Sequence, residues 1–315
     1  MENLSLHPSA SVFHYALECF EGMKAYADKS GHVRLFRPDM NMKRLASSAQ
    51  RLCLPPIEQE SFLACIEELV RIDRRFIPQQ RGFSLYIRPT LIATTPWLGV
   101  GPTASFLFFT ILSPVGPYYP TGFKPVQLFA ETTRVRAAEG GTGHYKLGSN
   151  YAGTILPQVE AAAKGYSQVL WLYGPDHELT EVGTMNLFMY WINDKGEKEL
   201  ITPPLDGTIL PGVTRDSVLQ LARQWGEFKV VEKKFYMAEV VRAINQGRVL
   251  EMFGAGTAAI VSPINLIGYL GADYKVPLDK ANPNANAGPL ATRLSDTIMS
   301  IQYGDVPHPW SKVID

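Results

Sequence analysis

The stretch "GGTGHYKLGSNYAG", residues 140–153, places one lysine, Lys146, among five glycines and two tyrosines. Lysines usually lie on solvated surfaces, and glycines usually mark turns. Taken alone, the stretch therefore predicts a turn that carries a lysine. A lysine that reacts with an aldehyde needs space around its amine, and glycines leave such space for a ring and a moving side chain. The role of Lys146 depends on what the rest of the chain provides.

The composition is that of an ordinary globular protein, and it excludes several functions. Of 315 residues, 46% are apolar and 19% are charged, with 30 basic residues balancing 30 acidic ones. Without a basic surplus or a polybasic run, neither nucleic acid nor a membrane surface is an expected partner. The apolar run at 105–112 is far shorter than the roughly 20 residues of a membrane span. The six histidines are scattered, so we expect no metal.

The cysteines Cys19, Cys53 and Cys65 have no metal-binding or redox spacing. We expect them to be small buried hydrophobic residues in a reducing compartment. The first ten residues contain neither a secretion signal nor an Arg-rich presequence. The chain shows no targeting segment.

The first half of the chain predicts an α+β domain of strands and two amphipathic helices. Strands are expected at 31–37, 83–94 and 104–115. Helices are expected at 38–53 and 58–74. The buried stripe of the first helix is Met42, Leu45, Ala49 and Leu52, and that of the second is Phe62, Cys65, Ile66 and Leu69.

The second half predicts a larger strand-rich domain. A strand at 126–132 is followed by a helix near 150–164, kinked or restarted at Pro157. Further strands are expected at 168–173, 178–182, 186–192 and 198–203. A helix within 210–225 has Thr214 as its predicted N-cap. The predicted domains are 1–115 and 126–315, joined by a linker rich in Pro and Gly at 116–125.

Two glycine-containing stretches of the second half indicate a bound phosphate. "GAGTAA" (254–259) matches a dinucleotide fingerprint, with Asp273 near the expected offset, but Pro263 interrupts the helix that a Rossmann fold needs there. In "LPGVTRDS" (210–217) a glycine precedes a helix, whose free N–H groups favour an anion. Each stretch alone is typical of a turn; together, beside a lysine framed by glycines, they indicate a phosphorylated cofactor.

Pyridoxal phosphate (PLP) chemistry requires four kinds of side chain. A lysine forms an imine with the aldehyde, an acid keeps the pyridine nitrogen protonated, a phenol lies near the ring oxygen, and an arginine holds the phosphate. Lys146, Glu181, Tyr151 and Arg44 are of the right types. Spacing alone does not single them out among the other Lys, Glu and Arg residues.

Seven motifs resemble those of the branched-chain amino acid aminotransferases, which are fold-type IV PLP enzymes, and the eukaryotic, fungal-like branch is the most similar. The motifs are "FEGMKAY" (20–26), "LFRPDMNMKRLASSAQRLCLP" (35–55), "SLYIRPTLI" (84–92), "YKLGSNYAGTILPQ" (145–158), "LTEVGTMNLF" (179–188), "ITPPLDGTILPGVTRDSVL" (201–219) and "GAGTAAIVSPI" (254–264). The resemblance runs from about residue 5 to the C-terminus. It implies an α+β fold with a small N-terminal domain and a larger domain with a pseudo-barrel of strands.

The resemblance also implies roles for individual residues. Lys146 is the lysine that binds the cofactor covalently and moves the proton, Tyr151 faces the ring oxygen, and Glu181 pairs with the pyridine nitrogen. The implied phosphate ligands are Arg44, Val213, Thr214 and Thr257. Thr184 and Ala258 are implied at the substrate carboxylate. The implied walls of the side-chain pocket are Tyr15, Phe20, Tyr86 and Tyr118, and Arg88 is implied as the reader of glutamate's second carboxylate.

One of these implications agrees with the strand pattern itself. Tyr86 and Arg88 are two residues apart, so a strand directs both side chains to the same side. Apolar neighbours such as Leu85 and Ile87 indicate a buried setting for Arg88. An apolar pocket with one arginine suits both a branched aliphatic side chain and glutamate. Leu, Ile and Val differ by about one methylene or the position of a methyl group. A pocket can use such a difference to discriminate by only about 1–3 kcal/mol, so all three are expected substrates.

The expected function is transamination of Leu, Ile and Val with 2-oxoglutarate by a homodimer, giving branched-chain 2-oxo acids and glutamate. Two alternatives share the fold: a D-amino acid aminotransferase and an aminodeoxychorismate lyase, which the "LYIRP" and "GTMN" segments disfavour. A cofactor-binding subunit without turnover and a nicotinamide-dependent oxidoreductase are alternatives of other classes. The resemblance allows a cytoplasmic or a mitochondrial matrix location.

Three features depart from the family pattern. The chain begins where the family has a further N-terminal stretch, which contributes to the pocket. Ala259 and Ser262 replace the C-x-x-C redox pair of mammalian relatives, so no thiol switch is expected there. The segment "VRAAEGGTG" (135–143) lacks the tryptophan commonly found in the family, just ahead of Lys146.

Overall fold

The computed structural model describes residues 3–116, 123–282 and 284–315. The chain packs into two compact units. The first contains the described part of 1–117 together with 145–152 and 300–315, and the second contains the described part of 118–144 together with 153–299. The sequence predicted contiguous domains and did not predict that two later segments join the first unit. Most of the predicted linker, 116–125, lies outside the described residues.

The first unit is built on an antiparallel sheet of six strands. The strands are β1 (Glu18–Phe20), β2 (Met23–Ala27), β3 (Val33–Phe36), β4 (Ser84–Ala93), β5 (Phe106–Val115) and β15 (Ser311–Val313). Their order is β1-β4-β2-β3-β15, with β5 on the other edge of β4. Long central β4 therefore fixes the sheet, and the strands predicted at 31–37, 83–94 and 104–115 are confirmed as β3, β4 and β5.

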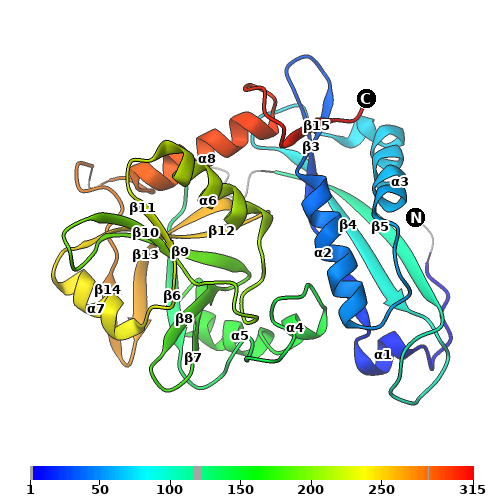
Figure 1. The fold of residues 1–315 in the computed structure, drawn as a ribbon, viewed down its shortest axis with the longest axis horizontal. Coiled ribbons are helices and arrows are strands. Elements are labelled where there is room, and N and C mark those ends of the chain that lie inside the picture. Colours follow the sequence, from blue (N-terminus) through cyan, green and yellow to red (C-terminus); the bar gives the residue numbers. More distant parts are fainter. Residues whose placement is uncertain (1–2, 117–122, 283) are drawn as a thin grey trace. The chain divides into compact units, whose positions relative to one another are not determined.

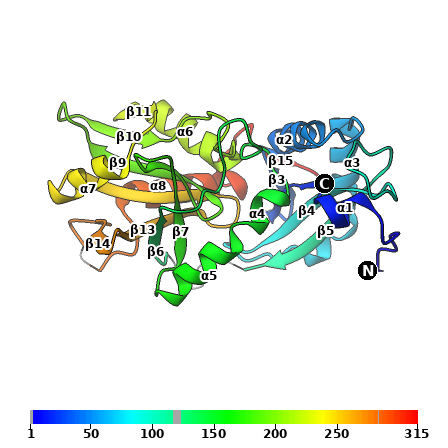
Figure 2. The same ribbon diagram turned by 90° about the horizontal axis from the view of Figure 1, so that it is seen from below.

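Helices α2 (Pro38–Arg51) and α3 (Gln59–Ile72) lie along one face of this sheet (Figure 2), and three short helices complete the unit. The short helices are α1 (Ser11–Tyr15), the 3₁₀ helix η1 (Arg74–Phe76) and α4 (Ser149–Ala152). Met42, Leu45 and Ala49 of α2 are buried against the sheet as predicted, and Leu52 is half-buried.

The prediction for the cysteines is wrong at two of three positions. Cys19 is buried, but Cys53 and Cys65 are exposed. The inward face of α3 is centred on Ile66 and Val70, and Cys65 lies outside that stripe.

The second unit is a mixed sheet that closes on itself (Figure 1). Its strands are β6 (Val126–Glu131), β7 (Gln168–Tyr173), β8 (Glu178–Val182), β9 (Met185–Ile192), β10 (Lys198–Thr202), β11 (Lys229–Glu232), β12 (Val249–Gly256), β13 (Ile260–Tyr269) and β14 (Ala272–Lys275). The order β9-β12-β13-β6-β7-β8 returns to β9, because β8 also pairs with β9. Six strands thus form a closed barrel, which confirms the predicted pseudo-barrel.

The helices of the second unit correct two predictions. They are α5 (Ile155–Ala163), α6 (Val213–Trp225), α7 (Met237–Asn245) and α8 (Pro289–Gln302), whose last residues belong to the first unit. The helix expected at 150–164 is two helices, α4 and α5. The break falls before Pro157, which lies in the first turn of α5, where a missing N–H costs no helical hydrogen bond.

Thr214 is not the N-cap of α6. Gly212 has the extended backbone of an N-cap residue, so the helix begins two residues earlier than Thr214 would allow, and Thr214 lies inside the first turn. Among the described residues, no helix combines the length and the apolar character that crossing a bilayer requires.

Candidate active site

Lys146 is held by its backbone against β1 and α2. The Phe20 N–H donates to the Lys146 carbonyl (3.1 Å), and the Lys146 N–H donates to Ser48 Oγ (2.9 Å). Gly148 allows this close approach, because a Cβ there would lie 1.8 Å from Glu18 Oε1. The glycine therefore makes room for a neighbouring side chain of the protein, whereas the sequence had suggested only room for a ligand.

The Lys146 amine lies in a partly buried, aromatic environment. Its Nζ donates to the Tyr151 hydroxyl (3.1 Å) and lies 4.6 Å from the centre of the Phe20 ring. Burial, and after it the nearby Arg44 guanidinium, lowers the pKa of Lys146 from its usual value of 10.5 to about 8. A lowered pKa increases the share of neutral amine near pH 7, and the neutral amine is the form that attacks a carbonyl or accepts a proton.

Tyr86 and Arg88 point to the same side of β4, as predicted. Arg88 Nη2 donates to the Tyr86 hydroxyl (3.0 Å), and the guanidinium lies 4.8 Å from the centre of the Phe20 ring. Arg88 Nε is buried and has no hydrogen-bond partner within the described part of the chain. A buried donor without an acceptor is costly, so this atom suits a ligand that brings an anionic oxygen.

Arg44 forms a buried ion pair that the sequence did not predict. Its Nε and Nη2 donate to the two carboxylate oxygens of Glu21 (2.7 and 2.9 Å). Glu21 is fully buried, and Asn41 Nδ2 and the Gly22 N–H also donate to it (2.7 and 3.1 Å). This network fixes the guanidinium of Arg44 on the inner face of α2. We call these residues of the first unit the lysine group: Lys146, Tyr151, Phe20, Tyr86, Arg88, Arg44 and Glu21.

One predicted pocket residue, Tyr15, is held by a different part of the first unit. Tyr15 is the last residue of α1, and its hydroxyl donates to the Leu98 carbonyl in the loop after β4. Tyr118 lies outside the described residues.

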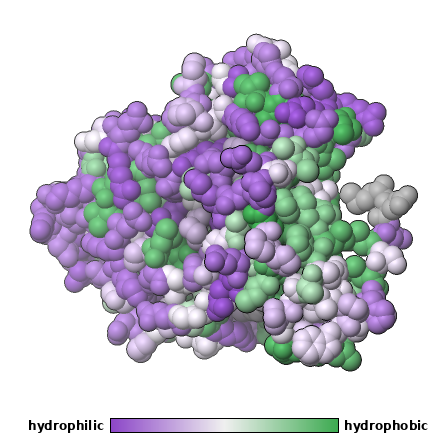
Figure 3. Space-filling model, turned by 45° about the vertical axis from the view of Figure 1, so that its right-hand side comes forward, coloured by the Kyte–Doolittle hydropathy of each residue, from purple (hydrophilic) through white to green (hydrophobic). Residues whose placement is uncertain are grey.

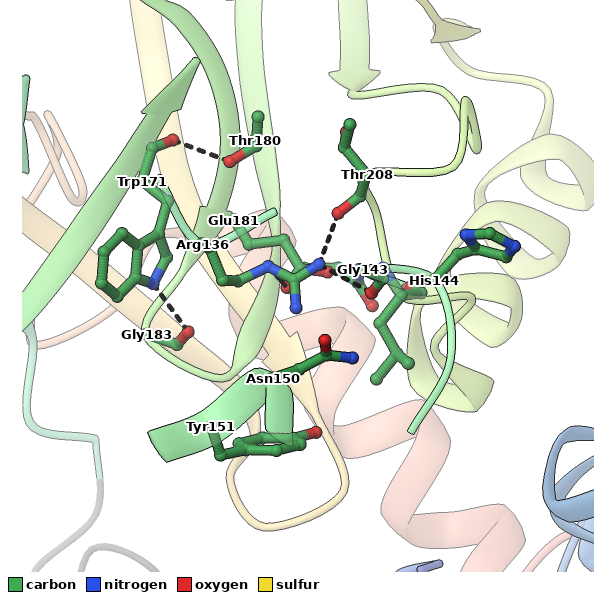
Figure 4. Close-up of polar contacts among 12 residues, drawn as sticks. Arg136, Gly143, His144, Asn150, Tyr151, Trp171, Thr180, Glu181, Gly183 and Thr208 are labelled. Carbon is green, nitrogen blue, oxygen red and sulfur yellow. Dashed lines mark hydrogen bonds and ion pairs between the residues drawn. The ribbon is translucent and has the colours of Figure 1, made fainter. Parts of the chain in front are cut away.

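In the second unit, Glu181 is held at the end of β8. Its Oε1 accepts from Asn186 Nδ2 (3.0 Å) and from the Leu210 N–H (2.9 Å). Its Oε2 lies 2.8 Å from Arg136 Nε, an ion pair in which both side chains are almost fully buried. Figure 4 shows Arg136 and Glu181 facing each other. The carboxylate is thus fixed in orientation by two donors and one cation.

The strand register brings the other predicted residues of this unit to the same end of the barrel. Glu181 pairs with Asn186, which places the turn with Thr184 at this end. Asn186 in turn pairs with Ala255 of β12, just before the turn that contains Thr257 and Ala258.

Helix α6 also begins at this end. A Cβ on its N-cap residue, Gly212, would lie 2.1 Å from Asn186 Oδ1. Because no side chain caps α6, the N–H groups of its first turn, including those of Val213 and Thr214, suit an anion. We call these residues the barrel-end group: Glu181, Arg136, Asn186, Thr184, Val213, Thr214, Thr257 and Ala258.

Three members of the two groups were missed by the sequence analysis: Glu21, Arg136 and Asn186. Glu21 and Asn186 belong to the quoted motifs "FEGMKAY" and "GTMN", and Arg136 belongs to the segment that departs from the family pattern. Among the described residues, no three His, Cys, Asp or Glu side chains are grouped to hold a metal ion.

Comparison with known proteins identifies the family. The model of the amino-transferase class IV family matches residues 18–267, most of the chain. The chain therefore belongs to the class IV amino-transferases.

The relatives narrow this class. The chain is 61% identical to the branched-chain-amino-acid aminotransferase of Dictyostelium discoideum, over 99% of this chain and 82% of that protein. It is 52% identical to the mitochondrial one of Schizosaccharomyces pombe, over 98% of this chain and 72% of that protein. At this identity and coverage, the particular family is that of the branched-chain-amino-acid aminotransferases.

Solved structures agree on the fold. The branched-chain amino acid aminotransferase of Thermobaculum terrenum, solved in its PLP form, superimposes with a TM-score of 0.76 at 22% identity. The superposition covers 99% of this chain and 94% of that one. The α+β, fold-type IV architecture predicted from the sequence is confirmed.

Proposed function

We propose that this protein is a PLP-dependent transaminase that transfers the amino group of L-leucine, L-isoleucine or L-valine to 2-oxoglutarate. The products are the branched-chain 2-oxo acids and L-glutamate. The observation that carries the proposal is the partly buried Lys146 amine, which lies 3.1 Å from the Tyr151 hydroxyl and has a pKa lowered to about 8. Family membership supports the same reaction.

Residues of both groups suit the cofactor. By the resemblance, the uncapped N-terminus of α6, the Arg44 guanidinium and Thr257 would hold the phosphate. Lys146 would bind the aldehyde, Tyr151 would face the ring oxygen, and Glu181 would pair with the pyridine nitrogen. Bound PLP supplies an aldehyde that takes up the amino group and a ring that accepts the electron pair released at Cα.

Lys146 moves the proton. In its neutral form, Nζ would accept the proton from Cα of the substrate. The same Nζ would hold this proton as an ammonium group and release it to complete the transfer. Tyr151, 3.1 Å from Nζ, keeps the amine in position. Burial favours this role because it disfavours the charged ammonium.

Arg88 provides the means of accepting two kinds of substrate. The Phe20 and Tyr86 rings present an apolar wall to a branched aliphatic side chain. When glutamate or 2-oxoglutarate binds, the orphaned Nε of Arg88 receives the second carboxylate. The resemblance also implies Tyr15 and Tyr118 for this wall, and by the same resemblance Thr184 and the Ala258 N–H would bind the carboxylate that all substrates share.

The protein acts as a homodimer. The first unit carries exposed apolar side chains that monomers usually bury, among them Phe13, Trp97, Leu98 and Val100. Figure 3 shows apolar surface on the face that it displays. Curated relatives are named both as cytosolic and as mitochondrial, and the compartment is one of these two.

The test is a turnover assay on the purified, cofactor-loaded protein. With L-leucine and 2-oxoglutarate, L-glutamate and 4-methyl-2-oxopentanoate should form in equal amounts. D-leucine is the control for a D-amino acid aminotransferase and should give no glutamate. If L-leucine, L-isoleucine and L-valine all give no glutamate although PLP is bound, the protein is a cofactor-binding subunit without turnover, and the proposal is wrong.

A further inference from the structure

We infer that Arg136 is a positioning residue for the reaction, and that it acts by orienting the Glu181 carboxylate. The inference rests on the proposed function, because Glu181 matters for catalysis only as the partner of the cofactor ring. Arg136 lies in the segment "VRAAEGGTG", where this chain departs from the family pattern. The contacts of the Arg136 guanidinium indicate that the segment positions Glu181.

Arg136 joins three parts of the second unit that are distant in sequence (Figure 4). Its Nε lies 2.8 Å from Glu181 Oε2 at the end of β8. Its Nη2 donates to the Gly143 carbonyl (2.9 Å) and to the Thr208 carbonyl. The contact with Glu181 is an ion pair and not an aligned hydrogen bond, since the Nε–H is not directed at the carboxylate.

The other two contacts of Arg136 are with the Thr208 carbonyl, close to a second hydrogen-bond donor to Glu181, and with the Gly143 carbonyl, in the segment that leads to Lys146. Thr208 precedes Leu210, whose N–H donates to Glu181 Oε1 (2.9 Å). Gly143 precedes Lys146 by three residues, and a Cβ on Gly143 would lie 2.3 Å from the Ala137 Cβ. The glycine at 143 therefore lets the chain fold back onto Arg136. The Arg136 guanidinium therefore holds the Glu181 carboxylate and also the two segments that contain Gly143 and Thr208.

Only an arginine suits this position. Its planar fork donates in several fixed directions at once and stays charged, whereas a lysine offers one compact charge on a flexible stem. Glu181 is almost fully buried, and a buried carboxylate requires a counter-charge. Lysine at 136 would keep the charge but lose the simultaneous hold on the Gly143 and Thr208 carbonyls. Glu181 would then keep a counter-charge and lose its fixed orientation.

The test is a double-mutant cycle with Arg136→Lys and Glu181→Gln, each alone and combined. Two quantities are measured: the dissociation constant of PLP, and the single-turnover rate with L-leucine and with its Cα-deuterated form. In the wild-type background, Arg136→Lys should slow single turnover about 10- to 100-fold, the scale of a misplaced catalytic group, and should raise the isotope effect. It should also weaken PLP binding several-fold.

In the Glu181→Gln background the same change should cost less than about 3-fold in either quantity, because residues that act through one another are not additive. Equal costs in both backgrounds would overturn the inference, since Arg136 would then act independently of Glu181. The PLP dissociation constants decide this even if the wild-type protein shows no turnover. An inactive wild type would contradict the proposed function alone.

Arg248→Lys is the matched control. Arg248 also holds a backbone carbonyl, that of Ile192 (2.8 Å), and a carboxylate, that of Asp194 (3.0 Å), but at the other end of β9. It should leave turnover and PLP binding unchanged. If Arg136→Lys fails to fold, Arg136→Gln takes its place in the cycle. If both unfold while Arg248→Lys remains folded, Arg136 is a structural residue and the inference is wrong.

Discussion

Two buried arginine–glutamate pairs, one in each unit, have the same chemistry and opposite arrangements. In the first unit, the pair is Arg44 with Glu21, and in the second it is Arg136 with Glu181. In the proposed function, the arginine of the first pair and the glutamate of the second face the cofactor. The remaining members, Glu21 and Arg136, support their partners from behind.

The contacts of the supporting residues differ accordingly. Glu21 accepts from Arg44, from Asn41 and from the Gly22 N–H, all of them donors of its own unit. Arg136 instead forms an ion pair with one carboxylate and donates to two carbonyls. In the proposed function, the phosphate ligand is thus held by a carboxylate and the partner of the ring nitrogen by a guanidinium. The comparison indicates that each proposed cofactor contact has a support of opposite charge.

Replacing Glu21, the supporting residue of the first pair, should have the largest effect on stability. Glu21→Ala leaves the buried Arg44 charge without its partner, which costs about 3–5 kcal/mol in the free energy of unfolding. Urea unfolding of the apoprotein, followed by circular dichroism, measures this loss.

Glu227→Ala is the control for Glu21→Ala. It breaks the pair with Arg293, in which both side chains are about half exposed, and should cost less than about 1 kcal/mol. If Glu21→Ala costs no more than Glu227→Ala, the first pair is not the buried, mutually dependent unit described above.

The pKa of Lys146 should also distinguish the two pairs, with a smaller effect. Its pKa of about 8 reflects burial, which lowers it, then Arg44, which lowers it, and Glu21, which raises it. Glu21→Gln removes a negative charge and should therefore lower the pKa below about 8. The rate at which the apoprotein recombines with PLP should follow the neutral amine, rising with pH and levelling off near the pKa.

Arg136→Gln provides the comparison for this titration. Because the largest causes of the Lys146 pKa shift all lie in the first unit and do not include Arg136, the midpoint should stay near pH 8. An unchanged midpoint in Glu21→Gln, or an equal shift in both variants, would contradict the distinction between the pairs.

Much of the fold was predictable, because its signals are local. Alternation in β4 and the apolar stripe of α2 appear within a dozen residues, and the strand positions followed from them. The errors at Cys65 and Thr214 are also local: each is one or two positions from the residue that the structure uses, Ile66 in the buried stripe and Gly212 at the cap.

The supports of the site were not predictable in this way. Glu21 and Arg44 come from β-strand and helix segments that only tertiary packing brings together, and Arg136 reaches Glu181 across the barrel end. No periodicity relates such partners, and the resemblance named only the ligand-facing member of each pair. The glycine at 148 was noticed, but its cause, the Glu18 side chain, becomes visible only in three dimensions.

The most direct test of the central claim is the half-reaction of the cofactor-loaded protein with L-leucine alone. We expect one 4-methyl-2-oxopentanoate per bound cofactor, a change in the visible absorbance of the cofactor, and no further product until 2-oxoglutarate is added. Lys146→Ala should abolish this conversion, and D-leucine should not start it. Conversion by Lys146→Ala at even half the wild-type rate would contradict the role assigned to the Lys146 amine.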